Sequence, residues 1–546
     1  MKAAKPYSFE FPVAKKKDVV VVGGGPGGFM AALSASRNGA DTLLIERDNY
    51  LGGMMTGGLV TSVWGFRHEQ GFRLGKAFEE EIVTSNWDTP LLVNGISLEV
   101  MTRVGKKGGR LEQGHLEDPS LHELIDPEIT KLVLDEMMEE SRVEVLYNTF
   151  AFNAVVEDNV AKGVAIANKS GGRVVLADMV VDASGDADIA AAAGAPFEIG
   201  RKEDGRHMGG SLMMEIGGID VHKYINYLKN RPKKTEKERQ KQEEEDSRLL
   251  GGGGTQDRIV TLDGEKGQYG GGGGGRQINW DGLDQVMEEG KFPLRLPGIE
   301  GEWLEFVKSG RVPAWHGAVK LIYIRPTSNS PGLLRGNKLR YDQARAGVHE
   351  AYFDQTNQEE ITKAIIWMRK MDGIYLDFLR ERIPGFENAY IIQISPMVGT
   401  RESRRITGEY TLTERDCVEG RRFPDVIAKG GYACNIHSVT GVWGDGYFME
   451  VKKPFDIPYR CLVPKKIENL LVAGRCISVT HVALGATRTE PPCMATGEAA
   501  GAAAALSAKL GVAPRNLDIK ILQKALLDQG VLLYLADEMP GAVPAA

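Results

Sequence analysis

Residues 18–28 read DVVVVGGGPGG, and this stretch decides the fold. Four valines predict a buried strand, and Gly23, Gly25 and Gly28 follow it with the spacing G-x-G-x-x-G. In that spacing the first glycine permits a tight turn, the second lets the backbone approach a pyrophosphate, and the third lets a helix pack on the strand. Pro26 suits the first turn of that helix, whose N-terminus attracts phosphate charge. The stretch therefore predicts a strand, turn and helix that bind a dinucleotide.

The next residues complete a βαβ unit. Gly39 marks the end of the predicted helix, and residues 42–45 form a second apolar strand that leads directly to Glu46. A carboxylate at this point accepts hydrogen bonds from ribose hydroxyls. The alternative is a glycine-rich turn in an α/β sheet with no ligand, and that alternative leaves Glu46 unexplained.

Composition narrows the class of protein. The chain has 546 residues, which favours more than one domain, and its net charge of −7 with no basic stripe argues against a nucleic-acid partner. Residues 1–17 lack the apolar segment of a signal peptide, and no run of apolar residues is long enough to span a membrane. The cysteines are odd in number and lack CxxC spacing, so we expect reduced thiols and a cytoplasmic protein. These cysteines are Cys417, Cys434, Cys461, Cys476 and Cys493.

Further elements follow from local patterns. Apolar residues at helical spacing after Asp126-Pro127 predict a helix over 126–141. The other expected elements are a strand at 143–147, an antiparallel pair at 151–156 and 163–167 that turns near Asp158-Asn159, a strand at 174–181, a strand at 467–475 and a helix at 493–510.

Several short motifs carry a family resemblance. They are the fingerprint at Gly23, Gly25 and Gly28 with Glu46, then Leu51-Gly52-Gly53-Met54, Asp182-Ala183-Ser184-Gly185-Asp186, Arg401-Glu402-Ser403-Arg404-Arg405, Asp456-Ile457-Pro458-Tyr459-Arg460 and Ala473-Gly474-Arg475-Cys476-Ile477. As a set they resemble the FAD-dependent oxidoreductases of glutathione-reductase-type fold. The resemblance is greatest to a bacterial flavoprotein group distantly akin to the fumarate reductase and succinate dehydrogenase flavoproteins. It covers about the first 215 residues and about 390–515, and it fails from about 216 to 390.

The resemblance implies FAD and a set of residues that hold it. The expected cofactor-binding residues are Gly23, Gly25, Pro26, Gly27, Gly28, Glu46, Arg47, Gly53, Met54, Met55, Thr56, Phe152, Ser184, Gly185, Asp186, Gly474, Arg475, Cys493 and Met494. Residues 151–153 would border the adenine. The methionines at 54 and 55 are equally compatible with a core patch. Cys493 is interpreted as a packing residue at a helix start and not as a redox thiol, because no second cysteine lies at CxxC spacing.

The implied fold class is α/β, with a three-layer, Rossmann-like FAD-binding domain built on a parallel sheet. We expect residues 17–215 and 456–515 to form this domain, and residues 216–455 to form an inserted α+β substrate domain. Residues 516–546 would be a helical tail. A charged run at 230–248 and polyglycine tracts within 230–276 predict a mobile surface insertion without catalytic groups.

Candidate catalytic residues are charged groups expected close to the flavin. Arg401 belongs to a dense run of arginines and is suited to bind an anion through bidentate geometry, although a salt-bridged strand edge explains the run equally well. His437 is the preferred acid or base, with His481 and Arg488 as further candidates. The sequence contains no metal-binding or serine-nucleophile motif, so we expect no metal.

These observations predict an FAD-dependent oxidoreductase that passes a hydride between a small organic substrate and flavin N5. A flavin monooxygenase and a non-catalytic electron-transfer subunit are the alternatives. Only one dinucleotide fingerprint is present, so we do not expect a built-in NAD(P)H domain. We expect a separate electron donor or acceptor. We also expect a homo-oligomer.

Overall fold

A computed structural model describes residues 10–68, 89–111, 122–230, 258–260, 266–267, 300–312, 325–326, 343–439 and 446–535. The charged run from 231 to 248 and the polyglycine tracts lie outside the described residues.

A seven-stranded sheet forms the centre of the first body. Its parallel strands are β6 (Glu144–Leu146), β2 (Thr42–Ile45), β1 (Val13–Val22), β9 (Gly171–Asp182) and β22 (Leu470–Val472), in that spatial order. The register pairs Val22 with both Ile45 and Asp182, and Asp182 also pairs with Val472. The carboxyl ends of these strands therefore meet at one edge, where ligands bind in open parallel sheets. The predicted Rossmann-like α/β architecture is confirmed.

The first half of β9 also pairs, along the edge opposite β1, with an antiparallel hairpin. β8 (Val160–Asn168) pairs with β9, and β7 (Phe150–Glu157) pairs with β8. Asp158 and Asn159 connect the hairpin with φ of 50° and 62°, a left-handed turn that Asp and Asn tolerate. This hairpin confirms the predicted antiparallel pair.

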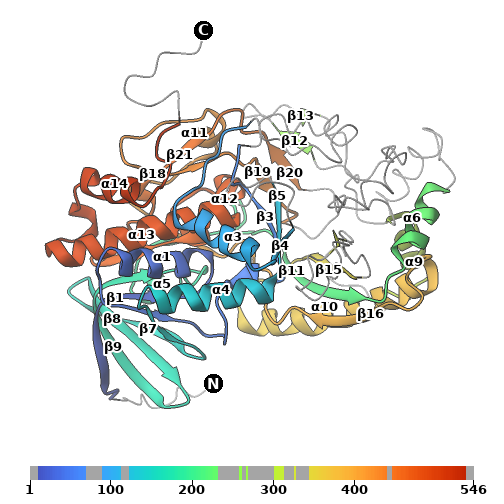
Figure 1. The fold of residues 1–546 in the computed structure, drawn as a ribbon, viewed down its shortest axis with the longest axis horizontal. Coiled ribbons are helices and arrows are strands. Elements are labelled where there is room, and N and C mark those ends of the chain that lie inside the picture. Colours follow the sequence, from blue (N-terminus) through green and yellow to red (C-terminus); the bar gives the residue numbers. More distant parts are fainter. Residues whose placement is uncertain are drawn as a thin grey trace, which may run out of the picture.

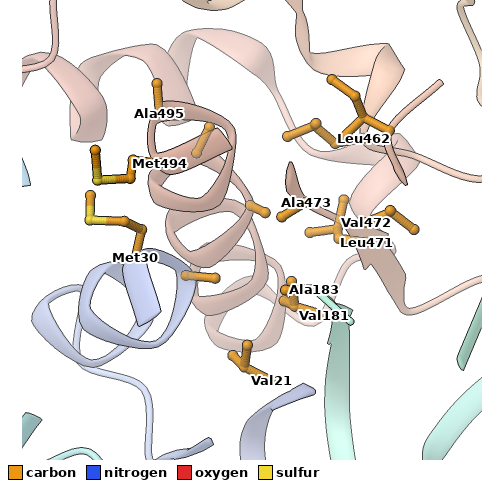
Figure 2. Packing of buried hydrophobic residues seen from close by; sticks show 14 of the residues in the cluster. Val21, Met30, Val181, Ala183, Leu462, Leu471, Val472, Ala473, Met494 and Ala495 are labelled. Atoms are coloured by element: carbon orange, nitrogen blue, oxygen red, sulfur yellow. The ribbon is translucent and has the colours of Figure 1, made fainter. Parts of the chain in front are cut away.

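Helices cover the parallel sheet, and two of them pack unusually closely (Figure 1). They are α1 (Pro26–Arg37) and α13 (Glu490–Leu510). A Cβ at Gly497 would lie 2.8 Å from Gly27 Cα, and one at Gly501 would lie 2.8 Å from Ala31 Cα. Figure 2 shows Met30 and Met494 facing each other from these two helices. Small residues thus let the helix backbones touch.

The predicted helix boundaries hold with one difference. α4 (Pro127–Glu140) confirms the helix expected at 126–141, and Asp126 caps it by accepting the Glu128 and Ile129 N–H groups. α13 begins at Glu490, three residues before the predicted start, because its first turn tolerates Pro491 and Pro492, which need no N–H there.

A second, antiparallel sheet lies between β9 and β22 in the sequence. Its order is β14 (Arg325–Pro326), β15 (Gln343–Ala351), β11 (Gly210–Gly217) and β16 (Tyr390–Ile394). The long helix α10 (Gln358–Arg382) packs on this sheet, and α6 (Val221–Lys229) and α9 (Glu300–Lys308) lie near its end (Figure 1). These elements share a separate hydrophobic core that includes Leu212, Met368 and Phe386, and together they form the second body.

The remaining elements are short and complete the first body. They are η1 (Gly53–Met55), β3 (Ser62–Trp64), α3 (Ile96–Lys106), β4 (Arg110–Leu111), β5 (His122–Ile125), α5 (Asp188–Ala192), β10 (Phe197–Ile199), β12 (Arg258–Val260), β13 (Lys266–Gly267), β17 (Arg404–Ile406), α11 (Glu414–Val418), β18 (Val426–Gly430), β19 (Cys434–Ile436), β20 (Tyr447–Met449), β21 (Phe455–Pro458), η3 (Tyr459–Cys461), η4 (Gly474–Cys476), α12 (His481–Thr487), η5 (Pro514–Asn516) and α14 (Ile519–Asp528). Ile406, Phe455 and Ile457 belong to the first core. No helix in the described ranges is long and apolar enough to cross a membrane.

Candidate active site

In the glycine turn after β1, two glycines have no room for a side chain and one faces open space. Gly23 has φ of 94°, and a Cβ at Gly28 would overlap the Gly23 carbonyl oxygen, so both must be glycine for the helix to pack on the strand. Gly25 caps the N-terminus of α1, and a Cβ there would meet only Gly53 Cα, at 3.9 Å. This open position at a helix N-terminus fits a pyrophosphate.

Three other glycine turns lie around that position. A Cβ at Gly53 would lie 2.9 Å from Gly25 Cα, and one at Gly27 would lie 3.0 Å from the Gly474 nitrogen. A Cβ at Gly185 would lie 2.9 Å from the Arg475 guanidinium. The turns after β1, β2, β9 and β22 therefore meet at the edge where the parallel strands end.

Glu46 lies buried beside the turn. One carboxylate oxygen accepts the Gly24 N–H and the other accepts the Asp48 N–H at 2.8 Å. Burial raises the pKa of Glu46, and the two backbone N–H groups oppose that rise. Each oxygen retains a second lone pair, so a ribose hydroxyl can still donate to it. Arg47 is exposed and faces Asp48 at 3.9 Å.

The turn after β9 carries an ion pair and a buried cap. Arg475 pairs with Asp186 at 2.8 Å and donates to the Ser403 hydroxyl at 3.0 Å. Burial alone would raise the pKa of Asp186, but the Arg475 charge and the hydrogen bonds from Ser403 and Arg475 together lower the pKa. Asp182 is fully buried and accepts the Ser184 hydroxyl at 2.6 Å and the Ala190 N–H at 2.7 Å. Asp182 thus shapes the turn that carries Ser184, Gly185 and Asp186.

The N-terminus of α13 extends beyond the phosphate turn. Gly497 is level with Gly27, and Glu490 precedes it by seven residues, a helical length of about 10 Å. Cys493 lies on this extension, and its thiol contacts the Thr487 carbonyl at 3.7 Å. Burial raises the pKa of Cys493 to about 12, so the sulfur stays a thiol. Met494 is wholly buried in the helix interface.

The glycine-rich segment after β2 contacts the second body. Thr56 is buried and donates to the Leu51 carbonyl at 2.6 Å, and Met55 is buried beside it, whereas Met54 is half-buried. The Ser395 hydroxyl, which follows β16, donates to the Gly57 carbonyl at 2.7 Å. Phe152 is exposed on β7 and meets Phe11 edge to face, with ring centroids 5.8 Å apart.

The crossing segment, residues 401–405, connects the two bodies, and within it the carboxylate of Glu402 is buried. Glu402 accepts the Met208 N–H at 3.0 Å, His481 Nδ1 at 2.9 Å and the Arg405 guanidinium. Burial would raise the pKa of Glu402, but the hydrogen bond from His481 and the charges near it lower the pKa. Arg405 also donates to the Val479 carbonyl at 3.0 Å. Glu402 and Arg405 therefore hold the crossing segment in place.

Contacts connect the remaining candidate residues. Arg401 is buried and donates to the Gly209 carbonyl at 2.7 Å, and the Gly209 N–H donates to the Ser438 carbonyl at 3.0 Å, next to half-buried His437. Arg488 donates to the carbonyl of Asn435, two residues before His437, at 3.3 Å. The structure thus connects Arg401 and Arg488, through backbone contacts, to the segment 435–438 that carries His437, while Glu402 holds His481.

Sequence patterns did not indicate some residues of this region. Gln355 accepts the Arg401 backbone N–H at 3.2 Å, and Ser395 holds the Gly57 carbonyl. Both come from the middle of the chain, where no motif marks them. A buried glutamine or serine carries no sequence signal until its partners are known.

The fold and the four glycine turns define a dinucleotide-binding protein. The chain belongs to the FAD dependent oxidoreductase family, whose model matches residues 18–526. The protein is an FAD-dependent oxidoreductase, and FAD is its cofactor.

Curated relatives match only short segments. A dihydrolipoyl dehydrogenase of Haloferax volcanii is 42% identical over 50 residues, which are 9% of this chain and 10% of the relative. A dihydrolipoyl dehydrogenase of Trypanosoma brucei brucei is 51% identical over 43 residues, which are 8% of this chain and 9% of the relative. The matched segments thus span about a tenth of the length of either relative.

Among solved structures, a geranylgeranyl bacteriochlorophyll reductase-like protein from Thermoplasma acidophilum is similar over 95% of this chain and 84% of its own. Its sequence identity is 13% and its TM-score is 0.39.

Proposed function

We propose that this protein transfers a hydride between a small organic substrate and N5 of FAD. FAD supplies two-electron chemistry at that ring atom. The observation that carries the proposal is the extension of α13 by about 10 Å beyond the phosphate turn, with Arg488 two residues before its start. A helix N-terminus there stabilises the negative charge that a reduced flavin ring carries.

The residues around the glycine turns would hold the cofactor. Gly25, Pro26, Gly27 and Gly28 at the start of α1 would bind the pyrophosphate, and Glu46 would accept the ribose hydroxyls. The turns of the other strands would hold the rest, through Ser184, Gly185, Asp186, Gly474 and Arg475 near the pyrophosphate and ribityl chain, and through Gly53, Met54, Met55 and Thr56 beside the ring. Phe152 would border the adenine.

His437 would exchange the proton that accompanies the hydride. Its support is its place beside Ser438, whose carbonyl holds the Gly209 N–H, and two residues after Asn435, which contacts Arg488. Arg401 would bind or polarise the substrate from the crossing segment. Because Glu402 holds His481 Nδ1, His481 is the second candidate for proton exchange.

The finer relationships also belong to the proposal. We infer a glutathione-reductase-type fold distantly akin to fumarate reductase flavoproteins, supported by the set of motifs at 23–28, 182–186, 401–405 and 473–477. The single dinucleotide fingerprint supports a separate electron donor or acceptor. A cytoplasmic homo-oligomer completes the proposal.

An anaerobic screen of small organic compounds tests the proposal by following bleaching of the flavin band. A true substrate should bleach the wild type, and His437→Gln should keep FAD and slow bleaching by at least about a hundredfold. His481→Gln serves as the comparison. Rapid incorporation of oxygen from O2 into the substrate, with NAD(P)H as the electron source, would favour a monooxygenase. A flavin that can be reduced and reoxidised while no compound is turned over would favour an electron-transfer subunit.

A further inference from the structure

Arg488 is a half-buried arginine that differs from Arg405 and Arg475 in its partners. Arg405 pairs with Glu402, and Arg475 pairs with Asp186. Arg488 forms no ion pair with a carboxylate in the described ranges of the chain. One guanidinium nitrogen donates to the Asn435 carbonyl at 3.3 Å, and the buried Nε–H has no partner.

This arrangement is unfavourable for the protein alone. A buried N–H without an acceptor costs free energy, and a desolvated cation without an anion costs more. Burial accordingly lowers the pKa of Arg488. The neighbouring Thr489 hydroxyl is also buried and without a partner. Unsatisfied donors on consecutive residues indicate that another molecule supplies the acceptors.

The position of Arg488 indicates an acceptor with negative charge. Arg488 is the C-cap residue of α12 and lies two residues before α13, whose N-terminus carries partial positive charge. The Asn435 contact ties it to the strand that leads to His437. A guanidinium with free donors presents a fork that matches a carboxylate.

We propose that Arg488 binds a carboxylate of the substrate, so that the substrate is a small organic anion. This inference rests on the proposed hydride transfer and names its substrate class. It assigns to Arg488 the anion binding expected of Arg401, because Arg488 keeps a buried Nε–H without a partner, whereas Arg401 donates to the Gly209 carbonyl from inside the crossing segment. Arg401 then positions the crossing segment.

The test is calorimetric titration of the oxidised holoenzyme with oxalate, and with neutral oxamide at matched ionic strength. Wild type should bind oxalate and not oxamide. Arg488→Gln should retain FAD and bind oxalate at least about tenfold more weakly, because it loses the charge and the fork. Arg488→Lys should fall between them. Arg460→Gln is the matched control, since Arg460 pairs with Asp425 at 2.8 Å and should leave oxalate binding unchanged.

Three results would overturn the inference. Wild type that binds no oxalate has no such anion site. Equal oxalate binding by Arg488→Gln and wild type would show that the arginine does not bind the anion. Unchanged oxalate binding with a lower flavin midpoint potential in Arg488→Gln would show that the arginine serves the flavin ring. The titration requires no turnover, so each of these results leaves hydride transfer to be judged by bleaching.

Discussion

Replacing Gly497 by alanine tests the close contact between α13 and the phosphate turn. The new Cβ would lie 2.8 Å from Gly27 Cα and nearer still to the Gly27 carbonyl oxygen, whereas ordinary contacts are 3.4–4 Å. Both neighbours are backbone atoms and cannot rotate away. The two helices must therefore move apart at the turn that we assign to the pyrophosphate.

The magnitude follows from two opposing terms. Overpacking costs about 1–3 kcal/mol, and exchanging glycine for alanine inside a helix returns about 1 kcal/mol. We expect a net loss of up to about 2 kcal/mol in the free energy of unfolding of the apoprotein. Gly501→Ala should lose a similar amount, because its Cβ would lie equally close to Ala31. Gly373→Ala, inside α10 with no atom within 4 Å, should gain about 1 kcal/mol, because only the helix-propensity term applies.

The assay combines thermal unfolding of the apoprotein with fluorescence titration of FAD. Gly497→Ala and Gly501→Ala should both lower Tm, and only Gly497→Ala should weaken FAD binding beyond its stability loss, because only it displaces Gly27. The reasoning is refuted if Gly497→Ala matches Gly373→Ala in both measurements. Equal weakening of FAD binding by Gly497→Ala and Gly501→Ala would refute the local effect on the phosphate turn.

Two further predictions concern buried groups on α13. Burial raises the pKa of Glu498 from its ordinary value near 4.5 to about 8, so the folded state holds a proton that the unfolded state releases between these values. The stabilisation from this proton should be complete below pH 4.5 and should fade as the pH rises through 8. Thermal unfolding across this range should show that Glu498→Gln removes this pH dependence of Tm. Parallel Tm profiles for wild type and Glu498→Gln would contradict the prediction. Cys493→Ala should keep FAD content and flavin reduction rates at wild-type levels, since the buried thiol has a pKa of about 12, and a large loss of reduction rate would give the thiol a chemical role.

Local signals made much of the fold predictable. The glycine spacing at 23–28 predicts a turn and the start of a helix, and the structure has α1 beginning at Pro26. Asp126-Pro127 predicts a second helix start, which the structure confirms. Such signals succeed because each depends on backbone geometry and capping within one or two turns.

The cross-body contacts were not predictable in the same way. His481 and Glu402 are 79 residues apart in the chain, and Gln355 reaches the Arg401 backbone from the second body. These contacts depend on how the two sheets pack, and no periodicity records that packing. The sequence marked the arginines at 401–405 and Arg488 as candidate site residues. Only the tertiary structure shows that Arg405 has a carboxylate partner and that Arg488 has none among the described residues.

The flavin content of Gly25→Asp tests the central claim most directly. A Cβ at Gly25 meets only Gly53 Cα, at 3.9 Å, and aspartate is a favourable residue at a helix N-cap, so the apoprotein should keep its fold and Tm. The carboxylate would occupy the position assigned to the pyrophosphate and would repel its negative charge. The account predicts that wild type releases stoichiometric FAD on denaturation and that folded Gly25→Asp releases none. Full FAD occupancy in folded Gly25→Asp would contradict it.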